Sequence, residues 1–337
     1  MDPAALPKVE LHLHLDCSLS YAAVAQLDPA VGPAEYQARF VAPAKCASLA
    51  DFLTRPPQMV ALLQTQAALR LAVRDLFDQL ARDRVIYAEV RFAPLLHTAG
   101  GLLPAAVVAA VERETAACTA ETGIAVRLLL CTLRHFTAAQ SLETAALAVQ
   151  FQRTLVAGLD IAGDETLPLA PHAAAFVHAH AHGIPCTAHA GEAREAGGPA
   201  SVRETLALLG PRRIGHGVRS AEDPALVQAL ARDGIHLEVC PTCNVQIDLF
   251  PTYADHPLDR LYRAGVALNL NTDTRAVTAV TLTEEYARTR WAFGWSATEL
   301  LATNRMALRA AFAPADLRAT LEARLEQAYT AADTTFG

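Results

Sequence analysis

The sequence predicts an α/β fold, a (β/α)8 barrel of the TIM type with a helical lid insertion after its first strand. Three observations predict it: eight short apolar runs typical of strands, long Ala-, Leu- and Arg-rich helical stretches between most of them, and a length of 337 residues. Strands that alternate with helices form a parallel sheet, and eight such units over this length are typical of a closed barrel. A doubly wound open sheet is the structural alternative.

The predicted strands follow one another along the whole chain. In order they cover residues 9–15, 85–92, 125–133, 155–161, 184–188, 213–215, 235–239 and 266–270. Helical patterns separate most of them, for example at 62–82, 104–121, 138–153 and 170–182. Because no repeat, low-complexity tract or linker interrupts this alternation, we expect residues 1–337 to form a single barrel domain.

The segment between the first two strands is too long for one crossover helix. Residues 20–83 contain PAEYQARFVAPAKCASLADFL and then a further helical pattern. An insertion here lies over the carboxyl ends of the strands, where the active sites of such barrels are found. We expect 20–83 to contribute lid helices, with 40–53 over the barrel mouth; an ordinary surface excursion explains the pattern equally well.

Composition excludes several classes of protein. The chain is 52% hydrophobic, carries a formal net charge of −7 and has only two lysines, Lys8 and Lys45, beside 12 histidines. The acidity argues against nucleic-acid binding, and no apolar run is long enough to span a membrane. Seven cysteines, an odd number, suit reduced thiols, and the N-terminus does not read as a secretory signal. We therefore expect a cytoplasmic protein that binds neither nucleic acid nor membrane.

Two histidines at the end of the first strand indicate a metal site. His12 and His14 lie two residues apart in VELHLHLD, so on a strand they share one face, and Asp16 continues that face. Paired imidazoles at the end of an apolar strand are suitable metal ligands. The alternative is a strand with polar residues facing solvent, which fits poorly with a barrel strand that is covered on both faces.

Further ionisable residues follow the later strands. TAHAGE supplies His189 and Glu192, RIGHG supplies His216, and LNTD supplies Asp273, each at the end of an apolar run. In a barrel these ends converge at one mouth. The predicted ligands are His12, His14, His189 and Asp273. Three imidazoles and a carboxylate suit zinc, with iron or another divalent ion as alternatives, and such a metal activates water near neutral pH. Glu192 and His216 remain as acid/base groups, so hydrolysis is predicted.

The scarcity of lysine limits the number of metals. Two-metal hydrolases on this barrel commonly bridge their metals with a carbamylated lysine near the fourth strand. The corresponding segment, GLDIAGDE at 158–165, has no lysine, so one metal is expected.

Two conspicuous motifs are interpreted as structural. HAHAH at 178–182 is interpreted as the last turn of a helix. The single CPTC at 240–243 lacks the second cysteine pair that a zinc ribbon needs.

The motifs together resemble the adenosine deaminases of the amidohydrolase superfamily, particularly the bacterial ones. The matching segments are PKVELHLHLD (7–16), FVAPAKCASLADFL (40–53), YAEVRFAPLLHTAGGL (87–102), GLDIAGDE (158–165), TAHAGE (187–192), RIGHG (213–217), EVCPTCNVQ (238–246) and LNTD (270–273). The resemblance implies one zinc on the four ligands named above. It also implies that Glu192 protonates purine N1 and that His216 and Asp273 orient the attacking hydroxide, so that ammonia leaves and inosine is formed.

The same resemblance implies how a purine nucleoside binds. Asp16 matches the position that contacts the ribose 5′-hydroxyl, and the backbone of Gly163 the position near purine N3. The implied substrate-binding residues are His14, Asp16, Gly163 and Thr274. Two positions depart from the family pattern: Cys17 replaces the usual Gly, and Thr274 replaces a second Asp that hydrogen-bonds purine N7.

These departures leave three hypotheses for function. The leading one is deamination of adenosine and 2′-deoxyadenosine, because CPTCNVQ is closer to the pattern of adenosine deaminases than to that of adenine deaminases. The second is deamination of another 6-aminopurine, such as aminodeoxyfutalosine, a methylated adenosine or adenine. The third is a nucleoside-binding protein with weak catalysis.

Overall fold

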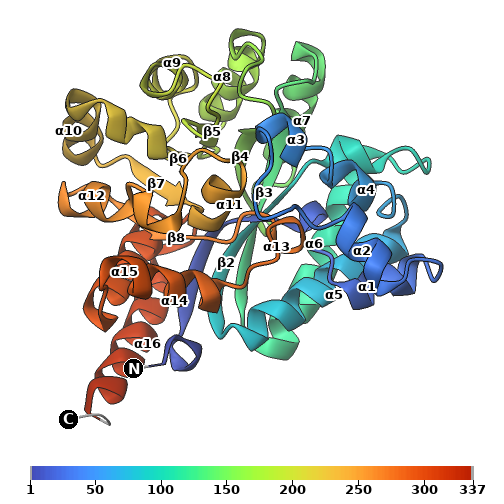
Figure 1. Ribbon diagram of the computed structural model, residues 1–337. Coiled ribbons are helices and arrows are strands. Elements are labelled where there is room, and N and C mark those ends of the chain that lie inside the picture. Colours follow the sequence, from blue (N-terminus) through green and yellow to red (C-terminus); the bar gives the residue numbers. More distant parts are fainter. Residues whose placement is uncertain (1, 335–337) are drawn as a thin grey trace.

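The protein is built round a closed barrel of eight parallel strands, in a computed structural model that describes residues 2–334 (Figure 1). Strands β1–β4 pair in chain order as one sheet and β5–β8 as a second. Parallel bridges from Leu13 to Asp273 and from Leu159 to Cys186 join the two sheets. The strands are β1 Lys8–His14, β2 Val85–Phe92, β3 Ala125–Leu133, β4 Val156–Ala162, β5 Thr187–Ala190, β6 Arg213–His216, β7 His236–Val239 and β8 Leu268–Leu270. The predicted barrel is confirmed, and the open sheet is excluded.

Helices surround the strands, as Figure 1 shows. Those that follow β2 to β6 are α6 Pro104–Thr122, α7 Ala138–Gln150, α8 Ala173–Ala181, α9 Pro199–Leu209 and α10 Pro224–Asp233. Those that follow β7 and β8 are α11 Pro241–Gln246, α12 Leu258–Arg263, α13 Arg275–Thr278, α14 Leu282–Phe293, α15 Ala297–Ala310 and α16 Ala315–Thr334. Within residues 2–334, no helix has both the length and the apolar character needed to cross a bilayer.

Local sequence signals explain where the elements begin and end. Helix α7 starts at a capping box, in which the side chains of Thr137 and Gln140 each accept a hydrogen bond from the backbone N–H of the other residue. Helix α6 ends at Gly123, whose φ of 71° is accessible to glycine without a steric penalty. The fifth strand begins at Thr187, three residues later than expected, because Pro185 has no N–H to give to a ladder.

The long segment between β1 and β2 contains five helices. They are α1 Tyr21–Leu27, α2 Pro33–Arg39, α3 Leu49–Phe52, α4 Pro56–Val60 and α5 Gln66–Arg82. Only α5 is the crossover helix that returns to the sheet, and it begins at Gln66 because the Thr65 side chain caps its first turn. The shorter helices α3 and α4 lie at the carboxyl end of the barrel, where they line a cavity.

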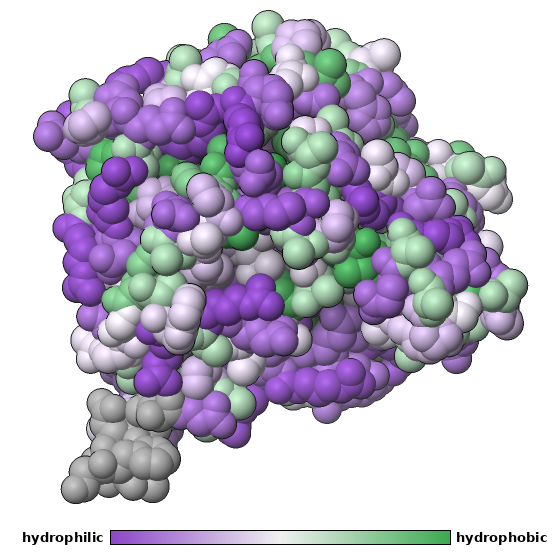
Figure 2. Space-filling model, viewed as in Figure 1, coloured by the Kyte–Doolittle hydropathy of each residue, from purple (hydrophilic) through white to green (hydrophobic). Residues whose placement is uncertain are grey.

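The outer surface is polar and the interior is largely apolar. Figure 2, in the same view as Figure 1, shows mainly hydrophilic residues with smaller apolar areas set between them. One continuous core of buried side chains runs from Leu6 to Tyr329. Charged residues are nevertheless buried inside the barrel, among them Arg91 and Arg213, which are at most 1% exposed. Since a buried charge without a partner is costly, these residues must be paired.

Candidate active site

Four side chains from three strand ends meet at the mouth of the barrel. His12 and His14 come from β1, His189 from β5, and Asp273 from the turn after β8. One ligand atom from each lies within 4.8 Å of all the others. Nε2 of His14 is 3.3 Å from Nε2 of His189, and Oδ1 of Asp273 is 3.3 Å from Nε2 of His12. The structure therefore brings together all four residues that were predicted as ligands.

The donor set fits a metal ion. Nδ1 of His12 lies 2.9 Å from Glu238 and Nδ1 of His189 lies 3.2 Å from Asp160, so each imidazole donates its N–H to a carboxylate. Both Nε2 lone pairs then face the cluster, and that of His12 is buried without a hydrogen-bond partner among the described residues. Three imidazoles with converging lone pairs and one carboxylate are a suitable ligand set for zinc.

A network of buried ion pairs orients these imidazoles. Arg91 lies 2.8 Å from Asp160 and 2.7 Å from Glu238, and Arg213 lies 2.7 Å from the other oxygen of Glu238. Although burial opposes ionisation, Arg91 and Arg213 lower the pKa of Glu238 to about 2. Glu238 therefore remains a carboxylate that holds His12.

Glu192 stands beside this cluster on a tightly fixed loop. The Glu165 carboxylate accepts hydrogen bonds from three successive backbone N–H groups, those of Gly191, Glu192 and Ala193. Oε2 of Glu192 is 3.5 Å from Nε2 of His216. Burial raises the pKa of Glu192 well above its usual value, and the negative charges of Asp273 and Glu165 raise it further. The environment thus favours a protonated, proton-donating carboxyl group.

A relay of hydrogen bonds fixes the tautomer of His216. The backbone N–H of Leu258 donates to Nδ1 of His256, so Nε2 of His256 carries the hydrogen and donates to Oδ1 of Asn244. The amide of Asn244 then donates to Nδ1 of His216, at 3.1 Å. Because a backbone N–H can only donate, it fixes Nδ1 of His256 as an acceptor. Each donor and acceptor role further along the relay follows from the one before it. A neutral His216 therefore carries its hydrogen on Nε2, the atom that faces Glu192.

Backbone strain also marks this site. His216 and Asp273 have φ values of 61° and 64°, in the left-handed region that side chains with a Cβ seldom adopt. Both lie at the point where a barrel strand turns into a loop. Such strain persists where the surrounding structure over-determines it, and it is frequent at functional sites.

A cavity of about 780 Å³ opens directly above the cluster. Its apolar wall is formed largely by Leu49, Phe52, Leu53, Pro56, Pro57 and Val60, all from the segment after β1. Asp16, Cys17, Gly163 and Thr274 also line it, together with His14, Glu192 and His216. Among its described lining residues none is Arg or Lys, whereas four are Asp or Glu. This cavity therefore suits a neutral, partly apolar ligand.

The predicted substrate-contacting residues occupy definite places in this cavity. Asp16 accepts a hydrogen bond from the backbone of Ala93 and lies 3.4 Å from His97, which lowers the pKa of Asp16 despite its burial. Gly163 has a φ of 99°, where a side chain would be strained. The hydroxyl of Thr274 is buried without a hydrogen-bond partner in residues 2–334, so it is available to a ligand.

The two motifs interpreted as structural differ in their positions. His180 donates to the backbone of Leu209 and His182 to that of His178, at the end of α8 and away from the cluster. Cys240 and Cys243 are buried free thiols near the site, and Cys243 lies 4.0 Å from Glu192. No sequence signal pointed to this contact, because a CxxC spacing does not show which loop it faces.

The comparisons with known proteins agree with this geometry. The family model described as adenosine deaminase matches residues 7–328. The chain belongs to the adenosine deaminase family. An adenosine deaminase from Enterococcus faecalis is 36% identical over 332 residues, which cover 96% of this chain and 97% of that protein. With this membership, the chain is a hydrolytic deaminase.

Two solved structures share the fold of this family member. An adenine deaminase from Arthrobacter aurescens superposes with a TM-score of 0.87 at 25% identity, covering 96% of this chain and 98% of that one. An N6-mAMP deaminase from Arabidopsis superposes with a TM-score of 0.85 at 25% identity, again covering 96% and 98%. The proteins that this chain resembles are therefore named as deaminases of a nucleoside (adenosine), of a base (adenine) and of a nucleotide (N6-mAMP).

Proposed function

We propose that this member of the adenosine deaminase family hydrolyses adenosine and 2′-deoxyadenosine to inosine and 2′-deoxyinosine with release of ammonia. The observation that carries the proposal is the cavity itself. It places the imidazole–carboxylate cluster, Glu192 and His216 at the floor of a space lined by apolar residues and without any described cationic group. A purine nucleoside is neutral and largely apolar, and it fits a cavity of this size.

One zinc ion per chain is part of the proposal, held by His12, His14, His189 and Asp273. When bound, zinc supplies a Lewis acid that makes water nucleophilic near neutral pH. Neither lysine is available to bridge a second metal. Lys8 donates to the backbone of Leu6 and Asp83, and Lys45 to the backbone of Val245 and Phe250.

The chain's own residues supply the proton transfers. Glu192, with its raised pKa, donates a proton to N1 of the purine, which makes C6 more electrophilic. His216 donates from Nε2 and so orients the oxygen that attacks C6, since its Nδ1 accepts from Asn244. Asp273 accepts a proton from the attacking water. Asp273 then passes this proton to the amino group, the C6–N bond breaks, and ammonia leaves. The proton of the O6 hydroxyl returns to Glu192 as the 6-oxo group of inosine forms, which restores both carboxyl groups.

The cavity lining favours a nucleoside over a nucleotide or a free base. A 5′-phosphate carries negative charge, and the described lining offers it Asp16 and Asp164 but no Arg or Lys. A free adenine leaves the part of the cavity next to Asp16 unfilled, together with the hydrogen bonds that a ribose makes there. We propose that 40–53 acts as a lid over the bound nucleoside, within a single domain of residues 1–337.

A second candidate function is deamination of a modified 6-aminopurine nucleoside. The observation that favours it is that Cys17 and Thr274, the two departures from the family pattern, both line the cavity. Each changes the shape and the hydrogen bonding of the wall that faces the substrate.

A panel of substrates tests both candidates. Metal-analysed, zinc-loaded enzyme is assayed for ammonia release from adenosine, 2′-deoxyadenosine, adenine, AMP, N6-methyladenosine and aminodeoxyfutalosine. We expect adenosine to have a kcat/KM at least about 100-fold above those of adenine and AMP, a difference of roughly 3 kcal/mol. A modified nucleoside that ranks first establishes the second candidate. Absence of turnover with every compound contradicts both and leaves a binding protein.

A further inference from the structure

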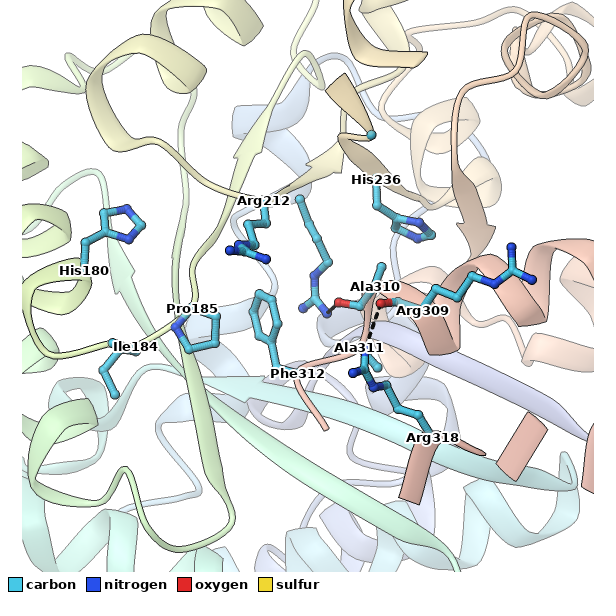
Figure 3. Close-up of a pocket in the computed structure, with 13 residues that line it drawn as sticks. His180, Ile184, Pro185, Arg212, His236, Arg309, Ala310, Ala311, Phe312 and Arg318 are labelled. Carbon is cyan, nitrogen blue, oxygen red and sulfur yellow. Dashed lines mark hydrogen bonds between the residues drawn. The ribbon is translucent and has the colours of Figure 1, made fainter. Parts of the chain in front are cut away.

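A second cavity lies at the opposite end of the barrel, among the amino ends of the strands. It has a volume of about 540 Å³ and is enclosed by the starts of β6 and β7, the loop before β5 and the turn between α15 and α16. Figure 3 shows Arg212, Phe312 and Pro185 on one side of it and His236, Arg309 and Arg318 on the other. Of its described lining residues four are Arg and two are His, and none is Asp or Glu.

Two of these arginines, Arg212 and Arg318, have no carboxylate partner in the described part of the chain, residues 2–334. The side chain of Arg212 makes no hydrogen bond or ion pair to any residue from 2 to 334, and Figure 3 shows it pointing toward Phe312. Arg318 donates only to the backbone oxygen of Arg309, at 3.0 Å. Some exposed arginines outside the cavity are paired, as Arg203 is with Asp223 and Arg232 with Asp233, whereas others, such as Arg113 and Arg153, have no carboxylate partner in residues 2–334. The cavity differs in that two unpaired arginines share one space whose described lining has no Asp or Glu. In a chain with a net charge of −7, unpaired cations in one cavity are a local reversal of the overall charge.

One wall of the cavity, formed by Arg213 and Phe312, is held in place by several contacts. Arg213 is fixed by Glu89 and by a bond to the backbone oxygen of Ala310, and its guanidinium stacks at 3.7 Å on the ring of Phe312. Because Glu89 and Glu238 already pair with Arg213, this residue shapes the wall of the cavity and adds little unneutralised charge to it. This wall is therefore held in place before any ligand arrives, which lowers the entropic cost of binding.

His236 adds a hydrogen-bond acceptor. The amide nitrogen of Asn269 donates to Asn271, so the oxygen of Asn269 accepts from Nε2–H of His236, at 2.9 Å. Nδ1 of the neutral His236 is then an acceptor, and it is buried without a partner among the described residues. A ligand that combines an anionic group with a hydroxyl satisfies the arginines, and its hydroxyl reaches this nitrogen once the side chains that cover the nitrogen move aside.

We propose that this cavity is a binding site for a small phosphate-bearing molecule, a phosphate monoester with a free hydroxyl group. Arg212 and Arg318 bind the phosphate oxygens through their planar guanidinium groups, and His236 accepts from the hydroxyl. The site is separate from the proposed nucleoside cavity, whose described lining offers a phosphate no Arg or Lys. The two cavities therefore favour different ligands, a neutral nucleoside at the carboxyl end of the barrel and an anion at the amino end.

Isothermal titration calorimetry tests the proposal without reference to catalysis. The probes are inorganic phosphate and ribose 5-phosphate, titrated into the full chain at physiological ionic strength so that weak surface pairing is screened. We expect ribose 5-phosphate to bind with a Kd of about 1 mM or tighter, and at least tenfold more tightly than inorganic phosphate. Equal affinity for the two probes assigns the site to free phosphate and overturns the monoester assignment.

Paired variants localise the binding. The double variant Arg212→Gln/Arg318→Gln is expected to weaken binding of ribose 5-phosphate at least tenfold, while the control Arg203→Gln/Arg232→Gln leaves it within twofold. Arg212, Arg203 and Arg232 are exposed and Arg318 is half-buried, so circular dichroism checks that each variant folds. The proposal is overturned if the wild-type chain shows no saturable heat, or if the two double variants bind equally.

Discussion

The two ends of this barrel have opposite chemical character. At the carboxyl end, imidazoles and carboxylates meet below an apolar cavity whose described lining has no Arg or Lys. At the amino end, arginines surround a cavity whose described lining has no Asp or Glu. Between them, Arg213 and Glu238 form part of a continuous buried chain of contacts that reaches His12. The two cavities are therefore suited to different ligands, a neutral one at the carboxyl end and an anion at the amino end, because each strand presents different residues at its two ends.

The largest expected effect comes from removing metal at the carboxyl end. Prolonged chelation should reduce deamination to background, because three imidazoles and Asp273 are left without the cation that they converge on. The free energy of unfolding should fall by about 4 kcal/mol if free zinc had been 1,000-fold above its Kd. Activity and urea denaturation are measured before and after zinc is restored. Full activity in metal-free protein contradicts the assigned ligand set, and ribose 5-phosphate binding at the amino end should not change.

Glu192→Gln should give the next largest loss. The amide keeps the shape of the side chain but has no acidic proton to give to the purine, so kcat should fall by about 10²–10⁴-fold. Zinc content, measured by elemental analysis, should stay at the wild-type level, since Glu192 is not one of the four ligands. The matched control is Glu204→Gln, an exposed residue of α9, which should retain full activity. A loss of less than tenfold at Glu192 rejects its role as proton donor.

Asn244→Asp tests the tautomer relay at the same end. A carboxylate accepts rather than donates, so it holds the hydrogen of His216 on Nδ1 and leaves Nε2 bare. We expect kcat to fall by about 10- to 100-fold with KM within twofold, corresponding to roughly 1.4–3 kcal/mol of transition-state stabilisation.

The control for this variant lies at the amino end of the barrel. Asn304 accepts a hydrogen bond from the backbone of Val9, and Asn304→Asp keeps that acceptor. It should alter stability but leave kcat unchanged. Equal kcat losses in both variants mean that Asn244 has a structural role only.

Thr274→Val should have a smaller and more selective effect. If the unpartnered hydroxyl of Thr274 donates to purine N7, its loss should lower kcat/KM for adenosine about tenfold. The 7-deaza analogue lacks that acceptor, so its kcat/KM should change by less than twofold. Equal losses for both compounds exclude the contact.

Glu285→Gln should affect stability and hardly affect turnover. Burial raises the pKa of Glu285 to about 7, where its oxygens meet the backbone of Thr242 and the hydroxyl of Tyr253. As pH rises from about 4.5 to 7, the unfolded chain loses this proton first, so wild-type stability falls across that window and is level above it. The variant should not show this fall in stability between pH 4.5 and 7. At pH 8 its free energy of unfolding should exceed that of the wild type by an amount on the order of 1 kcal/mol. Urea denaturation at pH 5 and pH 8 measures the difference, and identical pH profiles contradict it.

The carboxyl end was largely predictable from the sequence. Parallel strands converge at one edge, so residues that directly follow apolar runs meet there, and His12, His14, His189 and Asp273 were found in this way. Their supporting residues were not. Asp160 and Glu238 lie within strands, as His12 and His189 do, but strand periodicity does not show which charge across the barrel neutralises which.

The amino end was not predictable at all. Its cavity joins Arg212 after one helix, His236 at the start of a strand and Arg318 in the last helix, with no motif among them. Each looks like an ordinary surface or strand residue in the sequence. Only the closure of the barrel places them round one space, and the charge of that space follows from a described lining that contains Arg and His but no Asp or Glu.

The scarcity of lysine has a practical consequence for labelling. Lys8 is fully buried, whereas the side chain of Lys45 is 39% exposed and reaches across to Val245 in α11 and to Phe250 in the segment after it. Apart from the terminal amine, an amine-directed fluorophore should therefore attach at one lysine, within the segment 40–53 that we propose as a lid. A dye at Lys45 offers an optical probe of that segment without any engineered residue.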